Sequence, residues 1–181
     1  AYPNMSRMDW AVELFGWFNY YLKDIGDEPE PMVQIQTNDG RWHVEETWPP
    51  EDMTWDLQDI GANWLITGSS VDGFGSSVTL VSEELSELTH ISGLPTLHLD
   101  VTTQSCQGGQ IFATLYDNTD NLRLGHATMD VRYRDGGYDA KATAPFTSYT
   151  MLMEFNPLDV VVPAGHALRI ELTENGEDYL S

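Results

Sequence analysis

Residues 33–50 carry the clearest alternation of apolar and polar positions in the chain. Apolar or β-branched side chains alternate with polar ones over 33–37 and again over 42–45, with Asn38-Asp39-Gly40 between them. Period-two alternation on both sides of an Asp-Gly turn predicts a β-hairpin. Trp48-Pro49-Pro50 closes this segment, because proline cannot donate a hydrogen bond to a continuing strand. The chain before the hairpin has a helical pattern and the chain after it has a β pattern.

Residues 10–25 repeat apolar side chains at helical spacing. Ser6 to Asp9 resembles a capping box at the start, and Gly26 is a natural residue to end the helix. Only a narrow seam is polar, so a helix of this composition must be buried on most sides. The apolar stripe consists of Trp10, Leu14, Trp17, Tyr21 and Ile25, widened by Phe15, Phe18 and Leu22.

Two partners could cover this helix: the β domain that follows it, or a domain outside this chain. We favour the second. An aromatic stripe at helical spacing is ordinarily a packing surface and not a ligand site. We therefore predict a domain interface formed by Trp10, Leu14, Trp17, Phe18 and Tyr21.

Short strands with one apolar face, separated by Gly, Pro and Asn turns, fill the rest of the chain. This pattern is typical of a mainly β fold, an antiparallel β-sandwich of the jelly-roll type, here preceded by one amphipathic α-helix. Weakly patterned strands at 54–57 and 64–67 and a Gly/Ser-rich loop at 68–75 come first. The clearer strands are predicted at 76–82, 96–102, 111–117 and 124–134, with a turn at 118–121. Two more strands are predicted from rows of inward-facing residues. The first row is Tyr149, Met151, Met153 and Phe155, and the second, after a turn at 163–166, is Leu168, Ile170 and Leu172.

These elements divide the chain into two parts. Residues 1–30 are predicted to be a helix with a stiff acidic linker, and residues 31–181 a single sandwich domain. A domain near 150 residues can bury a self-sufficient core. With Cys106 as the one cysteine, no internal disulfide is available, so packing must hold the fold together.

The charge changes the expected surroundings of the protein. There are 29 acidic residues against 8 basic ones, a net charge of −21, and Lys23 and Lys141 are the two lysines. Such a field repels phosphate backbones, which argues against a nucleic-acid partner. An ordinary acidic protein would explain the balance, but we favour a protein of a high-salt cytoplasm, where molar salt shrinks the screening length to about 3 Å. The sequence has no membrane-spanning run and no signal peptide, so no membrane partner is expected.

No motif in the sequence predicts catalysis or a cofactor. There is no G-x-S-x-G, and Ser69, Ser70, Ser76 and Ser77 read as loop serines. The histidines are scattered without zinc-ligand spacing, and solvated imidazoles are expected for His43 and His98 on the polar faces of strands. The acidic turn at 117–121 offers oxygen ligands but lacks the glycine and distal Glu of a calcium loop. Cys106 has no neighbouring base. We predict no catalytic, cofactor or metal residue; the histidines are His43, His90, His98, His126 and His166.

Tryptophans gather at the start of the β domain, at Trp42, Trp48, Trp55 and Trp64. Buried tryptophans are a large part of a core, whereas exposed ones on a sandwich can stack on sugars. We expect core packing. A carbohydrate-binding module is the alternative function.

Four segments together resemble one known family. Residues 33–50 resemble its V-x-V…G-x-W-R…W-P-P segment, and 82–102 its S-x-x-L…I-x-G-x-P-x-x-x-L-x-V strand. Residues 113–117 resemble its A-x-L-x-D strand, and 162–172 its P-A-G-H-x-L-R-L-x-I signature. In this order the four resemble the C-terminal domain of X-Pro dipeptidyl peptidases and cocaine-esterase-like acyl hydrolases.

The resemblance implies a non-catalytic, galactose-binding-like jelly roll that packs on an α/β-hydrolase domain of the same polypeptide and helps to shape its active site. The Ser–Asp–His triad of such enzymes lies upstream, so this chain alone is expected to be inactive. The helix around residues 10–25 resembles the last helix of the hydrolase domain. A second copy of the chain, in a homo-oligomer, is the other partner considered. Gly165 and His166 are expected to have a structural role and not a catalytic one. The chain reads as a fragment that stops before an expected closing strand.

Overall fold

The structure is a computed structural model that describes residues 8–29, 33–50, 77–103 and 106–174. The strands predicted at 54–57 and 64–67, the loop at 68–75, Trp55 and Trp64 lie outside the described residues. Among those described, no helix is long and apolar enough to cross a membrane.

The N-terminal helix, α1 (Met8–Lys23), ends earlier than predicted. Asp24 takes the left-handed conformation at φ 52°, and the N–H of Ile25 bonds back to the carbonyl of Asn19 at 3.0 Å. The prediction that Gly26 ends the helix is therefore wrong, although Gly26 also has a positive φ of 93°. Aspartate is one of the few residues that enter the left-handed region at low cost, so it can terminate a helix without glycine.

The predicted hairpin is confirmed. Strands β1 (Val33–Gln36) and β2 (Trp42–Glu45) pair antiparallel, with Ile35 opposite His43. The N–H of Thr37 bonds to the carbonyl of Arg41 at 2.9 Å, and Gly40 supplies a φ of 86° in the turn. A positive φ at this place is what glycine adopts without steric cost.

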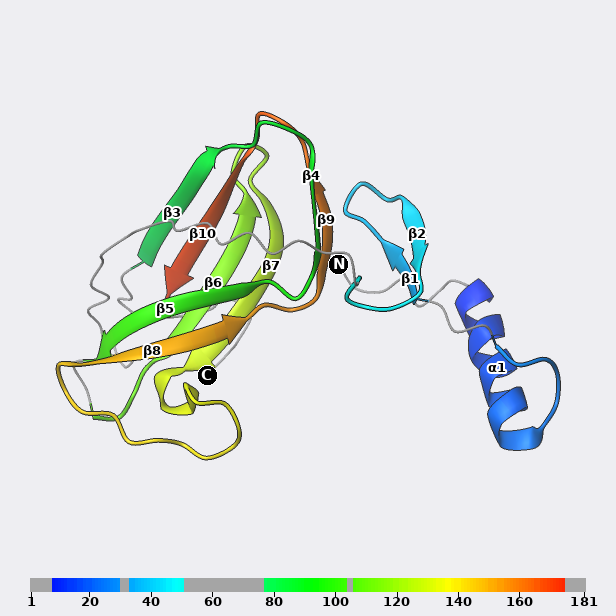
Figure 1. The fold of residues 1–181 in the computed structure, drawn as a ribbon, viewed down its shortest axis with the longest axis horizontal. Helices are drawn as coiled ribbons and strands as arrows, with labels where there is room; N and C mark the ends of the chain where they lie inside the picture. The colour runs from blue at the N-terminus through cyan, green and yellow to red at the C-terminus, as the bar shows by residue number, and fades with distance from the viewer. Residues whose placement is uncertain (1–7, 30–32, 51–76, 104–105, 175–181) are drawn as a thin grey trace.

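The larger layer of the β domain is an antiparallel four-stranded sheet in the order β3-β10-β6-β7 (Figure 1). Sequence-distant β10 lies between β3 and β6, so the C-terminal part of the described chain closes this sheet. The four strands are β3 (Ser77–Glu84), β6 (Gln110–Asp117), β7 (Leu122–Asp130) and β10 (Ala167–Thr173).

The second layer consists of two strand pairs, β5 with β8 and β4 with β9. Figure 1 shows β5 and β8 lying across the four-stranded sheet, and β4 and β9 at the side that faces the hairpin. The four strands are β4 (Thr89–Gly93), β5 (Thr96–Thr103), β8 (Thr147–Glu154) and β9 (Leu158–Val162). A mainly β antiparallel sandwich with one helix is thus confirmed, and its jelly-roll connectivity stays a prediction.

The core lies between the two layers. Leu99, Met151 and Met153 from the β5–β8 pair pack with Ala113 and Leu172 from the four-stranded sheet, and Met153 and Leu172 are 0% exposed. The inward row predicted from Tyr149 to Phe155 is confirmed, with Tyr149 only partly buried. Alternation therefore identified the buried face of these strands correctly.

The strand predicted at 124–134 is wrong at its end. β7 stops at Asp130, and Val131–Tyr133 form a 3-10 helix. The Asp130 carboxylate accepts the N–H of Arg132 at 2.9 Å, so it caps this turn. An aspartate that bonds to the backbone two residues on favours a turn over a continuing strand.

Candidate functional site

The face of α1 predicted as a domain interface is exposed. Trp10 is 45% exposed, Trp17 46% and Tyr21 51%, while Leu14 is partly buried. Phe18 is 40% exposed and contacts Trp17 edge to face, with ring centroids 5.3 Å apart. Large aromatic side chains dominate the energetics of protein interfaces. This face is the candidate site that the sequence predicted.

A shallow, mainly apolar hollow runs along the same face. Its lining consists of Trp10, Glu13, Leu14, Trp17 and Phe18. In Figure 1, α1 projects away from the sandwich, with the hairpin between the two. Of the two partners considered for this helix, the described part of the following β domain therefore does not cover it.

Apolar exposure also extends around the flank of the helix. Phe15 is 65% exposed, Leu22 70% and Ile25 59%. With one residue every 100°, Phe15, Leu22 and the interface row together span about 160° of the helix circumference. Contiguous exposed apolar surface of this extent marks a contact site.

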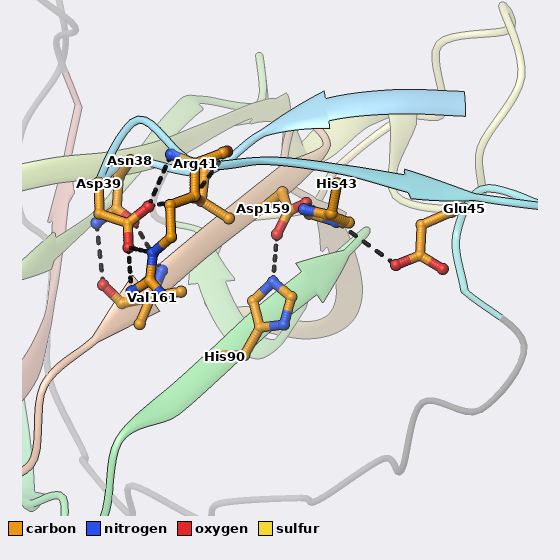
Figure 2. Close-up of polar contacts among 9 residues, drawn as sticks. Asn38, Asp39, Arg41, His43, Glu45, His90, Asp159 and Val161 are labelled. Atoms are coloured by element: carbon orange, nitrogen blue, oxygen red, sulfur yellow. Dashed lines mark hydrogen bonds and ion pairs between the residues drawn. The ribbon is translucent and has the colours of Figure 1, made fainter. Parts of the chain in front are cut away.

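The hairpin is joined to the sandwich by a polar junction, shown in Figure 2. The side-chain amide of Asn38 donates to the carbonyl of Val161 at 3.0 Å and accepts its N–H at 2.8 Å. Both bonds are made to β9 on the side opposite its partner β4. Asn38 thus satisfies backbone groups at the free edge of that strand.

Four ionisable side chains converge beside this contact. Nε2 of His43 lies 2.9 Å from Oδ2 of Asp159 and 3.5 Å from Oε1 of Glu45. Nε2 of His90 contacts the other oxygen, Oδ1, of Asp159 (Figure 2). The Asp159 side chain is 4% exposed, whereas those of His43 and His90 are 28% and 44% exposed. Asp159 is the buried centre of this group.

The expectation of a solvated His43 is wrong, because strand β2 turns its polar face inward, on the same side as the partly buried Val33 and Ile35 of β1. In β2 the apolar Trp42 and Val44 are 50% and 60% exposed, while His43 and Glu45 are turned inward and partly buried. Trp42 is therefore not a core residue either, and Trp48 is half-buried. His98 is exposed, as predicted.

No sequence signal could have assembled this group. Its members come from β2, β4 and β9, and no local spacing links them. The one available hint is that His43 and Glu45 occupy one face of a strand, two residues apart. Only the docking of the hairpin brings them to Asp159.

The acidic turn considered for calcium is satisfied by the protein itself. Oδ1 of Asp117 accepts the N–H groups of Thr119 and Asp120, and Oδ2 lies 2.7 Å from Nδ1 of His166. Burial works to raise the pKa of the Asp117 carboxyl, but the hydrogen bonds from His166 and the backbone outweigh it and lower that pKa. The same contact raises the pKa of His166. His166 therefore has a structural partner, and Gly165 has the expected positive φ of 81°.

The remaining sequence candidates are Cys106 and four serines expected in a loop, of which Ser77 instead begins strand β3. Cys106 is a free, exposed thiol. Ser69, Ser70 and Ser76 lie outside the described residues.

The comparison with protein families assigns most of the sandwich. Residues 59–175 match the model described as the X-Pro dipeptidyl-peptidase C-terminal non-catalytic domain. A Bacillus anthracis protein assigned as an Xaa-Pro dipeptidyl-peptidase is 24% identical over 204 aligned positions, which cover 96% of this chain and 34% of that protein. The chain thus spans about a third of the length of this curated relative.

Solved structures share the fold at low sequence identity. A CocE/NonD family hydrolase from Staphylococcus aureus superposes with a TM-score of 0.67 at 13% identity, over 96% of this chain and 39% of that one. An aminopeptidase from a marine sediment Thaumarchaeota archaeon gives 0.62 at 15% identity, over 88% and 35%. An α-amino acid ester hydrolase gives 0.60 at 17% identity, over 92% and 39%.

Proposed function

Because this chain belongs to the family of X-Pro dipeptidyl-peptidase C-terminal non-catalytic domains, we propose that it serves as the accessory domain of a larger serine hydrolase. The sandwich supports and helps to wall an active site that is built on an α/β-hydrolase domain of the same polypeptide. The catalytic groups lie on that other domain. Function resides in such a site and not in the sandwich fold itself.

The observation that carries this proposal is the uncovered aromatic face of α1. Trp10, Trp17 and Tyr21 are each about half exposed, and the strands that the structure describes do not cover them. Full burial of one exposed side chain of this kind is worth roughly 1.5–3 kcal/mol, so covering the exposed half of each side chain in the row is favourable. A catalytic domain that precedes α1 in the polypeptide is positioned to bury it.

A partner in the same polypeptide fits the proportions of the relatives. The chain covers 34–39% of the relative and of two of the hydrolases that share its fold, which leaves room for a catalytic domain in each. A covalently attached domain binds without the translational cost of association between separate molecules. A second copy of this chain on the same face is the competing occupant, and the test below separates the two.

The parent reaction follows from the activities for which the relatives are named. X-Pro dipeptidyl peptidases and ester hydrolases both attack an acyl carbon, at a peptide or an ester bond. We propose that the parent does the same with a serine activated by His and Asp. Whether it cleaves prolyl peptides or esters depends on the pocket of the catalytic domain.

Coexpression tests the interface. The gene region upstream of this chain is expressed as a separate polypeptide together with the chain, and a stoichiometric complex is expected. Trp17→Asp and Phe18→Asp should weaken the complex by at least about tenfold, since each places a charge in an apolar contact. Lys23→Asp, on the polar seam of the same helix, is the matched control and should leave it intact. A complex indifferent to Trp17→Asp, or a chain that forms its own dimer through this face, contradicts the proposal.

Activity measurements test the division of labour. The chain alone should not cleave p-nitrophenyl acetate or Ala-Pro-p-nitroanilide above background, whereas the full polypeptide should cleave one of them. Turnover by the chain alone, retained after removal of trace contaminants, would show that the sandwich carries its own catalytic site.

A further inference from the structure

We propose that His43, His90 and Asp159 form a binding site for one divalent transition-metal ion of the zinc class, at the junction between the hairpin and the sandwich. One donor atom from each residue lies within 4.8 Å of the others. Figure 2 shows the two imidazoles approaching the Asp159 carboxylate from β2 and β4. This site does not depend on the proposed hydrolase partnership.

The donor set suits zinc and its neighbours in the first transition series. Two imidazole nitrogens and one carboxylate oxygen form a mixed N/O site, which zinc, cobalt and nickel bind more readily than calcium or magnesium. Glu45 Oε1 lies 3.5 Å from His43 Nε2 but is not part of the three-residue group, which leaves the fourth position of the ion open. Donors at neighbouring vertices of a tetrahedral zinc ion are about 3.4 Å apart, given metal–ligand bonds near 2.1 Å. The 2.9 Å between His43 Nε2 and Asp159 Oδ2 needs to open by only a few tenths of an ångström.

Unsatisfied polar atoms provide a second, independent observation. Nε2 of His43 and Oδ2 of Asp159 are shielded from water and lie close together, yet their contact lacks hydrogen-bond geometry. Ser92, paired with Asp159 in the ladder, contributes another buried oxygen without a hydrogen bond among the described residues. Buried polar groups are nearly always paired, so three such atoms at one place call for an explanation. A cation that accepts lone pairs from nitrogen and oxygen accounts for the unsatisfied imidazole and carboxylate together.

The other ionisable cluster of this size among the described residues shows what a satisfied group looks like. In the group of Asp117, Asp120 and His166, both oxygens of Asp117 have hydrogen-bond partners of good geometry. Backbone N–H groups occupy Oδ1, and the imidazole of His166 occupies Oδ2. Because both oxygens of Asp117 already have hydrogen-bond partners, we assign a site only to the group around Asp159.

A metal at this place would fasten the hairpin to the β4–β9 pair. His43 comes from the hairpin, while His90 and Asp159 come from the sandwich. The strands hold the ligands: His90 and Asp159 are diagonal neighbours in the β4–β9 register, and Asn38 ties the hairpin to Val161 nearby. Ligands on paired strands are better positioned than ligands on loops.

Zinc titration of the whole chain tests the assignment. The titration is run against a chromophoric chelator in excess CaCl₂, so that the acidic surface, with its net charge of −21, is already occupied. We expect one zinc per chain. His90→Gln and Asp159→Asn should weaken binding at least about tenfold, and His98→Gln, at an exposed histidine on β5, should not change it. Binding that calcium abolishes, or an equal loss in His98→Gln, overturns the proposal.

Two further measurements keep the test decisive if a variant fails to fold. The unmodified chain with Co²⁺ should show the intense visible d–d bands of a tetrahedral site, and their absence overturns the tetrahedral assignment. Zinc should slow amide hydrogen exchange over residues 33–45 at least about tenfold, with no such change in His43→Gln. Exchange that zinc leaves unaltered in the unmodified chain overturns the role assigned to the ion.

Discussion

The side-chain amide of Asn38 pairs with the backbone of Val161 as a neighbouring strand would. It donates to the Val161 carbonyl at 3.0 Å and accepts the Val161 N–H at 2.8 Å. The two residues are 123 positions apart in the sequence. Through this contact the hairpin protects the edge of β9 that β4 leaves open. A covered edge is one of the ways in which sheets avoid pairing with other molecules.

Replacing Asn38 should therefore loosen the junction. In Asn38→Ala a partly buried donor and acceptor lose their partners, which costs about 1–3 kcal/mol. Hydrogen exchange at the Val161 amide is the direct measurement, and each 1.4 kcal/mol lost should speed it about tenfold. Glu46→Ala, at an exposed position that follows β2, is the control. An unchanged exchange rate of the Val161 amide in Asn38→Ala would show that the contact does not stabilise the junction.

A close approach of Gly125 to Leu158 predicts a second sensitive position. A Cβ on Gly125 would lie 2.6 Å from Cδ2 of Leu158, a side chain only 3% exposed. Gly125→Ala should destabilise the protein by about 1–3 kcal/mol, because a packed core has no room for the added methyl group. Urea unfolding measures this cost. Gly109→Ala has open space around its Cβ and serves as the control. Equal stability of the two variants would contradict the packing described for β7 and β9.

The pair formed by Asp117 and His166 predicts a pH-dependent stability. The hydrogen bond to Asp117 raises the pKa of His166 in the folded state, despite the opposing effect of partial burial. The stability contributed by this pair is therefore complete below the unfolded pKa of histidine, about 6.5, and is lost as the pH rises through the higher folded value. Melting temperatures from pH 5 to 9 should show this loss, and His166→Gln should lack it. His98→Gln should keep it.

The acidic side follows from the lowered pKa of Asp117. Its contribution is present above the unfolded pKa of aspartate, about 3.9, and is lost as the pH falls toward the lower folded value. In Asp117→Asn the melting temperature should depend less on pH over this range. A profile for Asp117→Asn that is identical in shape to that of the unmodified chain would contradict the coupling.

The net charge of −21 predicts that salt stabilises the protein. Raising KCl from 0.1 to 1 M shortens the screening length from about 10 to 3 Å and weakens the repulsion among carboxylates. We expect the weaker repulsion to add a few kcal/mol to the free energy of unfolding. Because 1 kcal/mol corresponds to roughly 2–4 °C for a chain of this size, Tm should rise by about 5–10 °C. The combined Glu83→Lys, Glu87→Lys and Asp139→Lys variant, at exposed positions, should respond less. A melt indifferent to KCl rejects the high-salt interpretation.

The periods of the sequence were enough for the fold class and for most of the secondary structure. Alternation located the hairpin, β5, β6 and the inward row of β8, because every second residue of a strand points to the same side. They did not locate β4 and β9 as separate strands. Short strands of five residues carry too few alternations to stand out.

The ends of elements were less predictable than their interiors. The helix stops at Asp24 and not at Gly26, and β7 turns at Asp130, in both cases through an aspartate. Local side-chain hydrogen bonds compete with regular structure at such residues, and periodicity does not register that competition.

By itself the sequence determined the helical apolar stripe, the strand alternation, the hairpin turn and the strongly acidic surface, because each depends on neighbours in the chain. Only the tertiary structure decided that His43 and Glu45 face inward while Trp42 faces water. It alone placed His43 and His90 on Asp159. Alternation gives a strand two faces but does not say which of them is buried. The structure that packs against the strand decides this, and for β2 it includes residues more than a hundred positions away in the chain.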